Sequence, residues 1–296
     1  MVQKNDSGNL YSNKTVMGLP VKNSFMFTNI KGVEKKGIKK RQLKLLKKLE
    51  FLPRFLKSDE EVYLVTTACS PISVLEQLTT GVLVFFIKRS LLVFTNKRII
   101  HIPTTAGYNY RHSIAQIQYS DIKDIKLSWG ALKIRYADKK KERFVQIGGK
   151  ERGKIKQFIR KLDLNRAASK YQHRYHICPS CMRSLKKGEY RCAGCGLEFK
   201  SSGRAQLLSL VIPGGGYFYT GHWFLGIMDF IVEAILILLV ANAYLGSEAT
   251  NGGDANSGII YLVVLVIEKL MTIYHANHYV KEYIPVTTRY KRRVMA

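Results

Sequence analysis

The sequence predicts a multidomain α+β membrane protein. Short runs rich in β-branched and aromatic residues alternate with turn residues over positions 60–165, which is typical of a β domain. Four cysteines in two close pairs follow, and two long apolar runs come after them. The 296 residues exceed the ~150 of a typical domain. A hydrophobic content of 46% is enough for more than one core.

The positive charge of the chain is missing from one long stretch. The formal net charge is +27 with 48 Lys and Arg, yet Lys269 is the only basic residue between 205 and 280. Apolar runs at 222–246 and 258–280 lie there, and a helix needs about 20 residues to cross the hydrocarbon core. One such run could be a buried helix of a soluble protein. Two in tandem, joined by a short polar loop, predict a C-terminal two-span α-helical hairpin.

The flanks of the two runs predict their orientation. The loop at 247–257 contains Glu248 and Asp254 and no Lys or Arg, whereas the tail at 281–296 contains five basic residues. Basic flanks stay in the cytoplasm. We therefore expect a multi-pass protein of the inner (cytoplasmic) membrane with both termini inside and an external loop. The N-terminus has no apolar h-region, so we expect no cleavable signal peptide.

A shorter apolar segment at 204–221 precedes the hairpin. It is too short to cross a bilayer and is interrupted by proline and glycines, so we expect an interfacial or re-entrant segment. Its pattern continues into the first span as Pro213-Gly214-x-Gly216-x-x-Tyr219-x-Gly221-x-x-x-x-Gly226. This pattern resembles the TM2-like family of small bacterial membrane hairpins. The resemblance implies a two-span hairpin and says little about activity.

Five ionisable residues interrupt the predicted spans: Asp229, Glu233, Glu268, Lys269 and His275. A rise of 1.5 Å per residue places Asp229 at the depth of His275, and Glu233 at the depth of Lys269. We expect these two pairs in an antiparallel hairpin. The favoured interpretation is polar contacts that hold the hairpin or a homo-oligomer together. The alternative is a proton or ion path, which requires an oligomer because two helices enclose no pore.

Two CxxC pairs predict a metal site, with ligands Cys178, Cys181, Cys192 and Cys195. Four thiolates suit tetrahedral Zn²⁺ and leave no open position, so the ion would be structural. The segment at 174–200 resembles a short bacterial zinc ribbon. A redox disulfide pair is the less favoured alternative, since redox CxxC motifs normally occur singly. His173 and His176 could substitute as ligands, but solvated histidines are favoured. Cys69 is expected to be a buried core thiol.

The β block at 59–165 is predicted to contain seven strands and a C-terminal helix. The expected strands lie at 61–67, 81–88, 90–96, 98–103, 113–119, 131–137 and 143–149. The helix is expected at 150–162, because Ile155, Phe158, Ile159 and Leu162 follow helical spacing.

Two parts of this block resemble bacterial PH-like and GRAM-like domains. They are LVFTNKRII at 92–100 and YSDIKDI at 119–125. The resemblance implies a PH-like β-barrel closed by the C-terminal helix, with Thr95 and Arg98 maintaining the fold. The lysine turn at 139–141, with Lys88 and Arg89, either contacts anionic lipid or is solvated.

No catalytic constellation is recognisable in the block, where His112, Asp121 and Asp124 are scattered in predicted turns. We therefore expect no enzymatic activity.

The N-terminal region combines a polar segment with a basic one. Residues 1–30 are rich in Asn, Ser and Lys and are expected to be disordered. At 31–58, a basic amphipathic helix is expected from 39 to 56, broken at Pro53. Its candidate membrane-surface residues are Lys39, Lys40, Arg41, Lys44, Lys47 and Lys48. Packing of the helix on the β domain, with its lysines in solvent, is an equal alternative.

The sequence therefore predicts a non-enzymatic scaffold or regulator whose PH-like and zinc-ribbon modules bind lipid or protein. The expected partners are anionic membrane lipids, an unidentified protein and a second copy of the chain. A membrane-tethered nucleic-acid-binding protein is an alternative that the charge and the zinc ribbon permit. We expect no nucleic-acid partner, because membrane orientation and anionic lipid already account for the positive charge.

Overall fold

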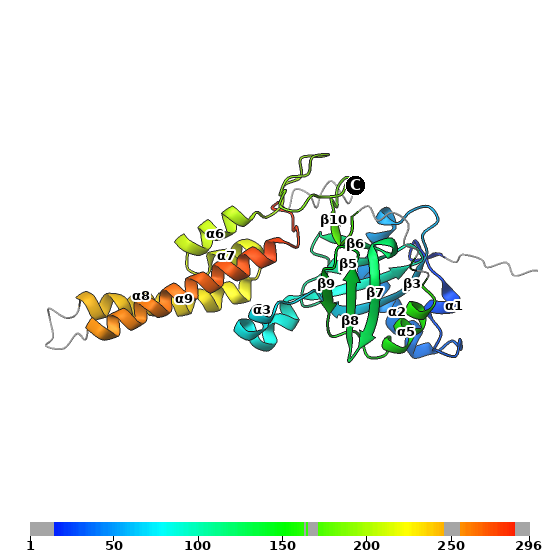
Figure 1. Cartoon of the computed structure of the whole chain (residues 1–296), viewed down its shortest axis with the longest axis horizontal. Helices are drawn as coiled ribbons and strands as arrows, with labels where there is room; N and C mark the ends of the chain where they lie inside the picture. Colours follow the sequence, from blue (N-terminus) through cyan, green and yellow to red (C-terminus); the bar gives the residue numbers. More distant parts are fainter. Residues whose placement is uncertain (1–14, 163, 165–170, 246–254, 288–296) are drawn as a thin grey trace, which may run out of the picture. The chain divides into compact units, whose positions relative to one another are not determined.

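The computed structural model describes residues 15–162, 164, 171–245 and 255–287 (Figure 1). The chain divides into two compact units. The β unit consists of Met1–Ile72, Lys88–Tyr110 and Ala115–Arg174. The helical unit consists of Ser73–Ile87, Arg111–Ile114 and Tyr175–Ala296. The helical unit therefore takes two short segments from the middle of the β domain.

Two antiparallel sheets form the main part of the β unit. The first has the order β6-β5-β4-β3, with β3 Val62–Cys69, β4 Arg89–Thr95, β5 Arg98–Pro103 and β6 Ile114–Gln118. The turn η4 (Tyr119–Asp121) leads to the second sheet of β7 Ile122–Ser128, β8 Ala131–Tyr136 and β9 Lys141–Phe144. The helix α5 (Arg152–Arg160) follows. Its Ile155 and Phe158 belong to the same buried cluster as residues of both sheets. One hydrophobic core therefore joins the first sheet, the second sheet and α5.

One expected strand is wrong. Residues 81–88 lie in a helical segment made of α3 (Val74–Thr80), η3 (Gly81–Leu83) and α4 (Val84–Ile87). A capping box starts it: Glu76 N donates to Ser73 Oγ at 3.0 Å, and Ser73 N donates to the Glu76 carboxylate at 3.3 Å. The seventh strand is instead β7, which contains Asp124 rather than leaving it in a turn.

The expected disorder at 1–30 is wrong for residues 15–30. The strands β1 (Thr15–Val16) and β2 (Leu19–Pro20) form a hairpin, and α1 (Asn23–Met26) follows. Met17 and Gly18 at its turn both have positive φ, 53° and 74°, as tight hairpins require. Leu19 and Met26 are fully buried, which ties the segment to the β unit. Residues 1–14 lie outside the described residues.

The basic segment is helical, but it is shorter and more broken than expected. It consists of α2 (Lys36–Leu46), η1 (Lys47–Leu49) and η2 (Leu52–Phe55), the last with Pro53 in its first turn. Its apolar side chains, such as Leu46 and Leu52, are fully buried. Buried Gln42 donates to Val65 O at 2.9 Å and accepts from Val65 N at 3.1 Å. The helix is therefore packed on β3, as the second alternative predicts.

A buried ion pair links the strands to the segment before them. Arg98 donates to both carboxylate oxygens of Glu60, at 2.8 and 2.6 Å, and to Phe55 O at 2.6 Å. Thr95 donates to the same carboxylate at 2.8 Å. Glu60, Thr95 and Arg98 are all buried. The prediction that Thr95 and Arg98 maintain the fold agrees with these contacts.

The helical unit is built around two long helices. After β10 (Tyr175–Ile177) come α6 (Ser202–Val211), α7 (Gly215–Thr220), α8 (Trp223–Leu245) and α9 (Ala255–Val280). The helices α8 and α9 pack side by side as a hairpin, and α6 and α7 pack against α9 (Figure 1). Most of the predicted external loop, residues 246–254, lies outside the described residues.

Among the described residues, α8 and α9 are the two helices long and apolar enough to cross a membrane. Only 17% of the most apolar stretch of α8 and 11% of that of α9 is buried. A core helix of a soluble protein would be mostly buried. The exposure therefore favours a lipid-facing hairpin.

The glycine pattern before the hairpin reflects close packing. A Cβ on Gly216 would lie 1.9 Å from Ser209 Oγ of α6 and 3.0 Å from Ala276 Cβ of α9. Gly214 has a φ of +67°, and a Cβ there would lie 2.2 Å from Gly226 O. Gly216 therefore allows α7 to lie close to α6 and α9, and Gly214 allows the start of α7 to lie close to the backbone of α8.

We expect Glu60→Gln to lower the free energy of unfolding by about 3–5 kcal/mol, because it leaves the Arg98 guanidinium buried without its counter-charge. Asp59→Asn is the matched control, since Asp59 pairs with Lys97 at the surface and exposed ion pairs contribute little to stability. Urea pulse proteolysis of the full-length protein in membranes measures both. Equal effects of the two substitutions would contradict the structural role of the buried pair.

Candidate metal centre and polar cluster of the hairpin

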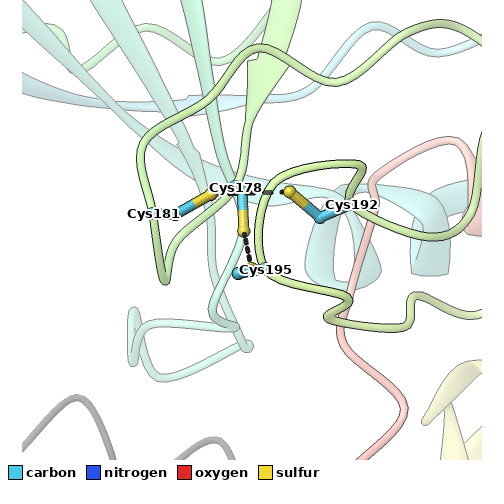
Figure 2. A group of neighbouring side chains, drawn as sticks. All are labelled: Cys178, Cys181, Cys192 and Cys195. Carbon is cyan, nitrogen blue, oxygen red and sulfur yellow. Dashed lines mark hydrogen bonds between the residues drawn. The ribbon is translucent and has the colours of Figure 1, made fainter.

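Four cysteine side chains converge in the helical unit (Figure 2). Their ligand atoms all lie within 4.8 Å of one another. The Sγ–Sγ distance is 3.5 Å for Cys178–Cys195 and for Cys181–Cys192. Four sulfurs in a tetrahedron around Zn²⁺, each about 2.3 Å from the ion, would lie about 3.8 Å apart. The donor set and the spacing are compatible with a metal ion, and all four predicted ligands are brought together.

The two cysteine pairs lie in matching turns. Met182 N donates to Cys178 O at 2.9 Å, and Gly196 N donates to Cys192 O at 2.9 Å. Met182 and Gly196 both have positive φ, at 60° and 71°. The same backbone turn occurs twice, which explains how both CxxC pairs present their thiols to one point.

The protein environment acts differently on the two buried thiols. Burial raises the pKa of Cys178. Burial also raises the pKa of Cys192. The backbone N–H groups of Gly194 and Cys195 donate to its sulfur and outweigh this effect, so that the pKa is lowered to about 7.

The chain that follows α9 packs against the cysteine turns. Tyr283 Oη donates to Lys186 O at 2.9 Å and accepts from Gly188 N at 2.8 Å. Its ring lies in one buried cluster with Cys178 and Cys192. Two backbone bonds, Lys200 N to Ile284 O at 2.9 Å and Val286 N to Glu198 O at 3.0 Å, continue the contact. We call the segment at 174–200, which contains the four cysteines, the cysteine module. The first part of the predicted tail packs on this module and completes its structure.

The other sulfur and imidazole candidates lie outside this cluster. His176 is buried against the Tyr283 ring, 4.9 Å between centroids, so its expected solvation is wrong. His173 lies with its Nδ1 3.4 Å from Asp138. Cys69 is a buried thiol of the β unit, as expected, and burial raises its pKa to about 11.

A second cluster of polar groups lies between α8 and α9. Carboxylate oxygens of Asp229, Glu233 and Glu268 lie within 4.8 Å of one another. Lys269 Nζ donates to the fully buried Glu233, so this predicted pair is present, and to Ser209 O of α6 at 3.0 Å. The cluster therefore joins three helices.

The second predicted pair is wrong. Thr272, rather than His275, contacts Asp229, with Oγ1 3.1 Å from the carboxylate. His275 Nδ1 lies 2.6 Å from Tyr217 Oη of α7, and its Nε2 lies 2.7 Å from Thr79 Oγ1 of α3. Asp229 meets Thr272, which precedes His275 by three residues, or about 4.5 Å along the axis of α9. Depth counted from the ends of the spans is therefore not accurate enough to define the contact.

Sequence reasoning missed a buried ionic contact at the end of the hairpin. Arg111 donates to Thr220 O at 3.1 Å and lies 3.5 Å from Glu282 and 3.2 Å from His222 Nε2. Both Arg111 and Glu282 side chains are 9% exposed. Burial, together with the charge of Arg111, lowers the pKa of Lys200 to about 8. No sequence pattern links residue 111 to residue 282, because they are far apart in the chain.

The predicted membrane-surface residues share one helical segment but differ in their contacts. Lys40, Lys44 and Lys47 are exposed. The exposed Lys39 and Lys48 contact Glu34 and Asn109, at 2.8 and 2.7 Å. Arg41 is half-buried and pairs with Glu151 at 2.8 Å, so it holds α2 rather than facing solvent. Lys88, which was a candidate for lipid contact together with Arg89 and the turn at 139–141, is buried.

The comparison with known families agrees with this architecture. Residues 56–163 match the family model of the bacterial PH domain. The match covers β3 to α5 and does not include the cysteine module or the hairpin. No curated protein matches the chain. The predicted PH-like module is thus confirmed, with the first sheet, the second sheet and the closing helix in order.

We expect Lys269→Met to lower the free energy of unfolding of the hairpin by about 3–5 kcal/mol, because it leaves Glu233 buried without a counter-charge. The double variant Glu233→Leu/Lys269→Met should lose less than the single one. SDS-induced unfolding followed by Trp223 fluorescence on a Trp129→Phe background measures both, with exposed Leu270→Ala as the control. A loss of stability in the double variant that is as large as or larger than that of Lys269→Met would contradict the dependence of the two groups on each other.

Proposed function

We propose that the chain is a non-enzymatic, membrane-anchored scaffold or regulator whose PH-like and four-cysteine modules bind lipid or protein. The observation that carries this proposal is the exposed apolar hairpin of α8 and α9 directly joined to the cysteine module. The match of residues 56–163 to the bacterial PH domain supports a binding role. Because a fold alone does not define a ligand, the partner has to be found from the surface.

In this proposal α8 and α9 span the inner membrane of a bacterium as a TM2-like hairpin. The basic residues on both sides of the hairpin and the acidic loop between the helices support a cytoplasmic location for both termini. The short segment of α6 and α7 then lies at the cytoplasmic interface. Its exposed Leu207, Leu210 and Val211 suit that environment.

The cysteine module is proposed to be a structural zinc ribbon. Its four thiols saturate a tetrahedral ion and leave no position for substrate. Tyr283 and the backbone bonds to Ile284 and Val286 connect the module to the end of α9. The zinc would therefore hold the cytoplasmic chain in a fixed arrangement at the end of the hairpin.

The polar cluster is proposed to hold the helices together rather than to conduct ions. Lys269 bridges Glu233 and the backbone of α6, and Thr272 contacts both Asp229 and Glu268. Such contacts across apolar helices replace the hydrophobic effect, which is absent between helices in lipid. A proton path through a homo-oligomer is the alternative that the three carboxylates would serve.

We expect purified full-length protein to contain about one zinc ion per chain. Cys178→Ser and Cys192→Ser should lose the metal, and trypsin should then cut faster at the lysines and arginines between 183 and 191. Cys69→Ser is the matched control, because Cys69 lies in the β unit and outside the cluster. Elemental analysis by mass spectrometry gives the metal content. Retention of zinc in both cluster variants would contradict the assignment.

Exposed lysines of the α2 segment are the proposed contact with anionic lipid, at about 1 kcal/mol each near the surface. In full-length protein reconstituted into nanodiscs, Lys40, Lys44 and Lys47 should be acetylated more slowly with anionic lipid than with neutral lipid. High salt should remove the difference. Exposed Lys133 of β8 is the control.

Equal acetylation rates in both nanodiscs would contradict lipid binding through α2. Protection of the same lysines by duplex DNA in neutral nanodiscs would support the nucleic-acid alternative instead. The two outcomes separate the two partner classes with one measurement.

A further inference from the structure

The connection between β3 and β4 is longer than its ends require. Cys69 and Arg89 face each other in the antiparallel ladder, and hairpin loops of 2–5 residues usually close such a pair. Here the connection contains α3, η3 and α4, and these residues belong to the helical unit. The extra residues are therefore not needed to close the hairpin of strands.

This segment, Ser73–Ile87, exposes most of its apolar side chains and buries its one charged side chain. Val74, Leu78 and Val82 are 78%, 76% and 71% exposed, and Phe86 is 50% exposed. The only ionisable residue of the segment, Glu76, is fully buried. A helix at a water-facing surface has the opposite arrangement. A continuous exposed apolar surface of this kind indicates a non-aqueous neighbour.

The buried polar side of the segment contacts the last turns of α9. Ser73 Oγ lies 2.8 Å from Tyr274 Oη, and Thr79 Oγ1 lies 2.7 Å from His275 Nε2. Glu76 lies 3.4 Å from His278 Nε2. Tyr274 is about 9 Å from the end of α9 at Val280, given a rise of 1.5 Å per residue. These contacts place the segment beside the part of α9 that enters the membrane in the proposed topology.

The apolar surface of the segment is continuous with that of the hairpin. An open groove of about 220 Å³ runs between α3 and α9. Its lining residues are Leu75, Thr79, Ile267, Leu270, Met271, Tyr274 and His275. Ile267 and Leu270 are 53% and 61% exposed on α9. A molecule that fills this groove contacts Ile267 and Leu270 of α9 and Leu75 of α3 together.

We propose that Ser73–Ile87 is a membrane insert whose exposed face lies in the acyl-chain region of the cytoplasmic leaflet, beside α9. The proposal rests on the proposed membrane-spanning hairpin. Acyl chains are the occupant because the groove joins the segment to the lipid-facing side of α9 and because no charged side chain is exposed on it. The PH-like domain would then enter the bilayer through its own β3–β4 connection, with polar side chains of the insert anchored to α9.

Single-tryptophan variants of the full-length protein test the proposal. On a Trp129→Phe/Trp223→Phe background, Leu78→Trp reports the apolar face of α3, and Leu238→Trp reports the exposed face of α8. Gln77→Trp is the matched control, because Gln77 is an exposed polar neighbour on the flank of the same helix. Each variant is reconstituted into vesicles with or without lipid brominated on its acyl chains.

We expect brominated lipid to quench Leu78→Trp and Leu238→Trp, with a smaller loss of intensity for Gln77→Trp. Quenching of Leu238→Trp without quenching of Leu78→Trp would overturn the insert while leaving the hairpin intact, whether residue 78 then faces water or another protein. If Leu238→Trp is also unquenched, the membrane-spanning hairpin itself is wrong.

Discussion

The ion pair between Glu233 and Lys269 fixes the register on which the helical unit depends. It joins α8 to α9, and the same ammonium reaches the backbone of α6. In lipid no hydrophobic effect drives helices together, so the register depends on close packing of small residues and on buried polar contacts such as this one. With α9 placed in this way, its last turns present Tyr274, His275 and His278 to the insert. The chain beyond α9 then reaches the cysteine turns.

The cysteine module is therefore continuous with the hairpin. The backbone enters α6 two residues after Lys200, which bonds to Ile284. A module held at both ends in this way cannot rotate freely as a domain on a flexible linker would. Tyr283 extends the constraint, because its hydroxyl bonds to both sides of the turn between the two cysteine pairs. A metal ion there would stiffen the end of a membrane anchor rather than support a separate domain.

Composition and periodicity were sufficient for six of the seven strands of the two main sheets, the closing helix, the cysteine cluster and the two apolar helices, because each rests on a local pattern. The insert was missed because an apolar run such as 81–88 fits a strand or a helix equally well. The Ser73-x-x-Glu76 capping box was the available signal. Arg111 with Glu282, and His275 with Thr79, were beyond prediction, because depth and composition do not define which helix faces meet.

The hairpin also changes what the other surfaces have to contribute. In the proposed topology the spanning hairpin binds the membrane almost irreversibly, so neither the lysines of α2 nor the proposed insert would need to supply affinity. Tethering raises the effective concentration of bilayer around them, and contacts of about 1 kcal/mol per lysine then suffice to choose an orientation. The lysine contacts weaken with salt, whereas burial of Val74, Leu78 and Val82 does not. If both proposed contacts form, salt or a change in lipid charge would release the lysines of α2 while the insert stays in the bilayer, and the PH-like module would have a reversible contact beside a permanent one.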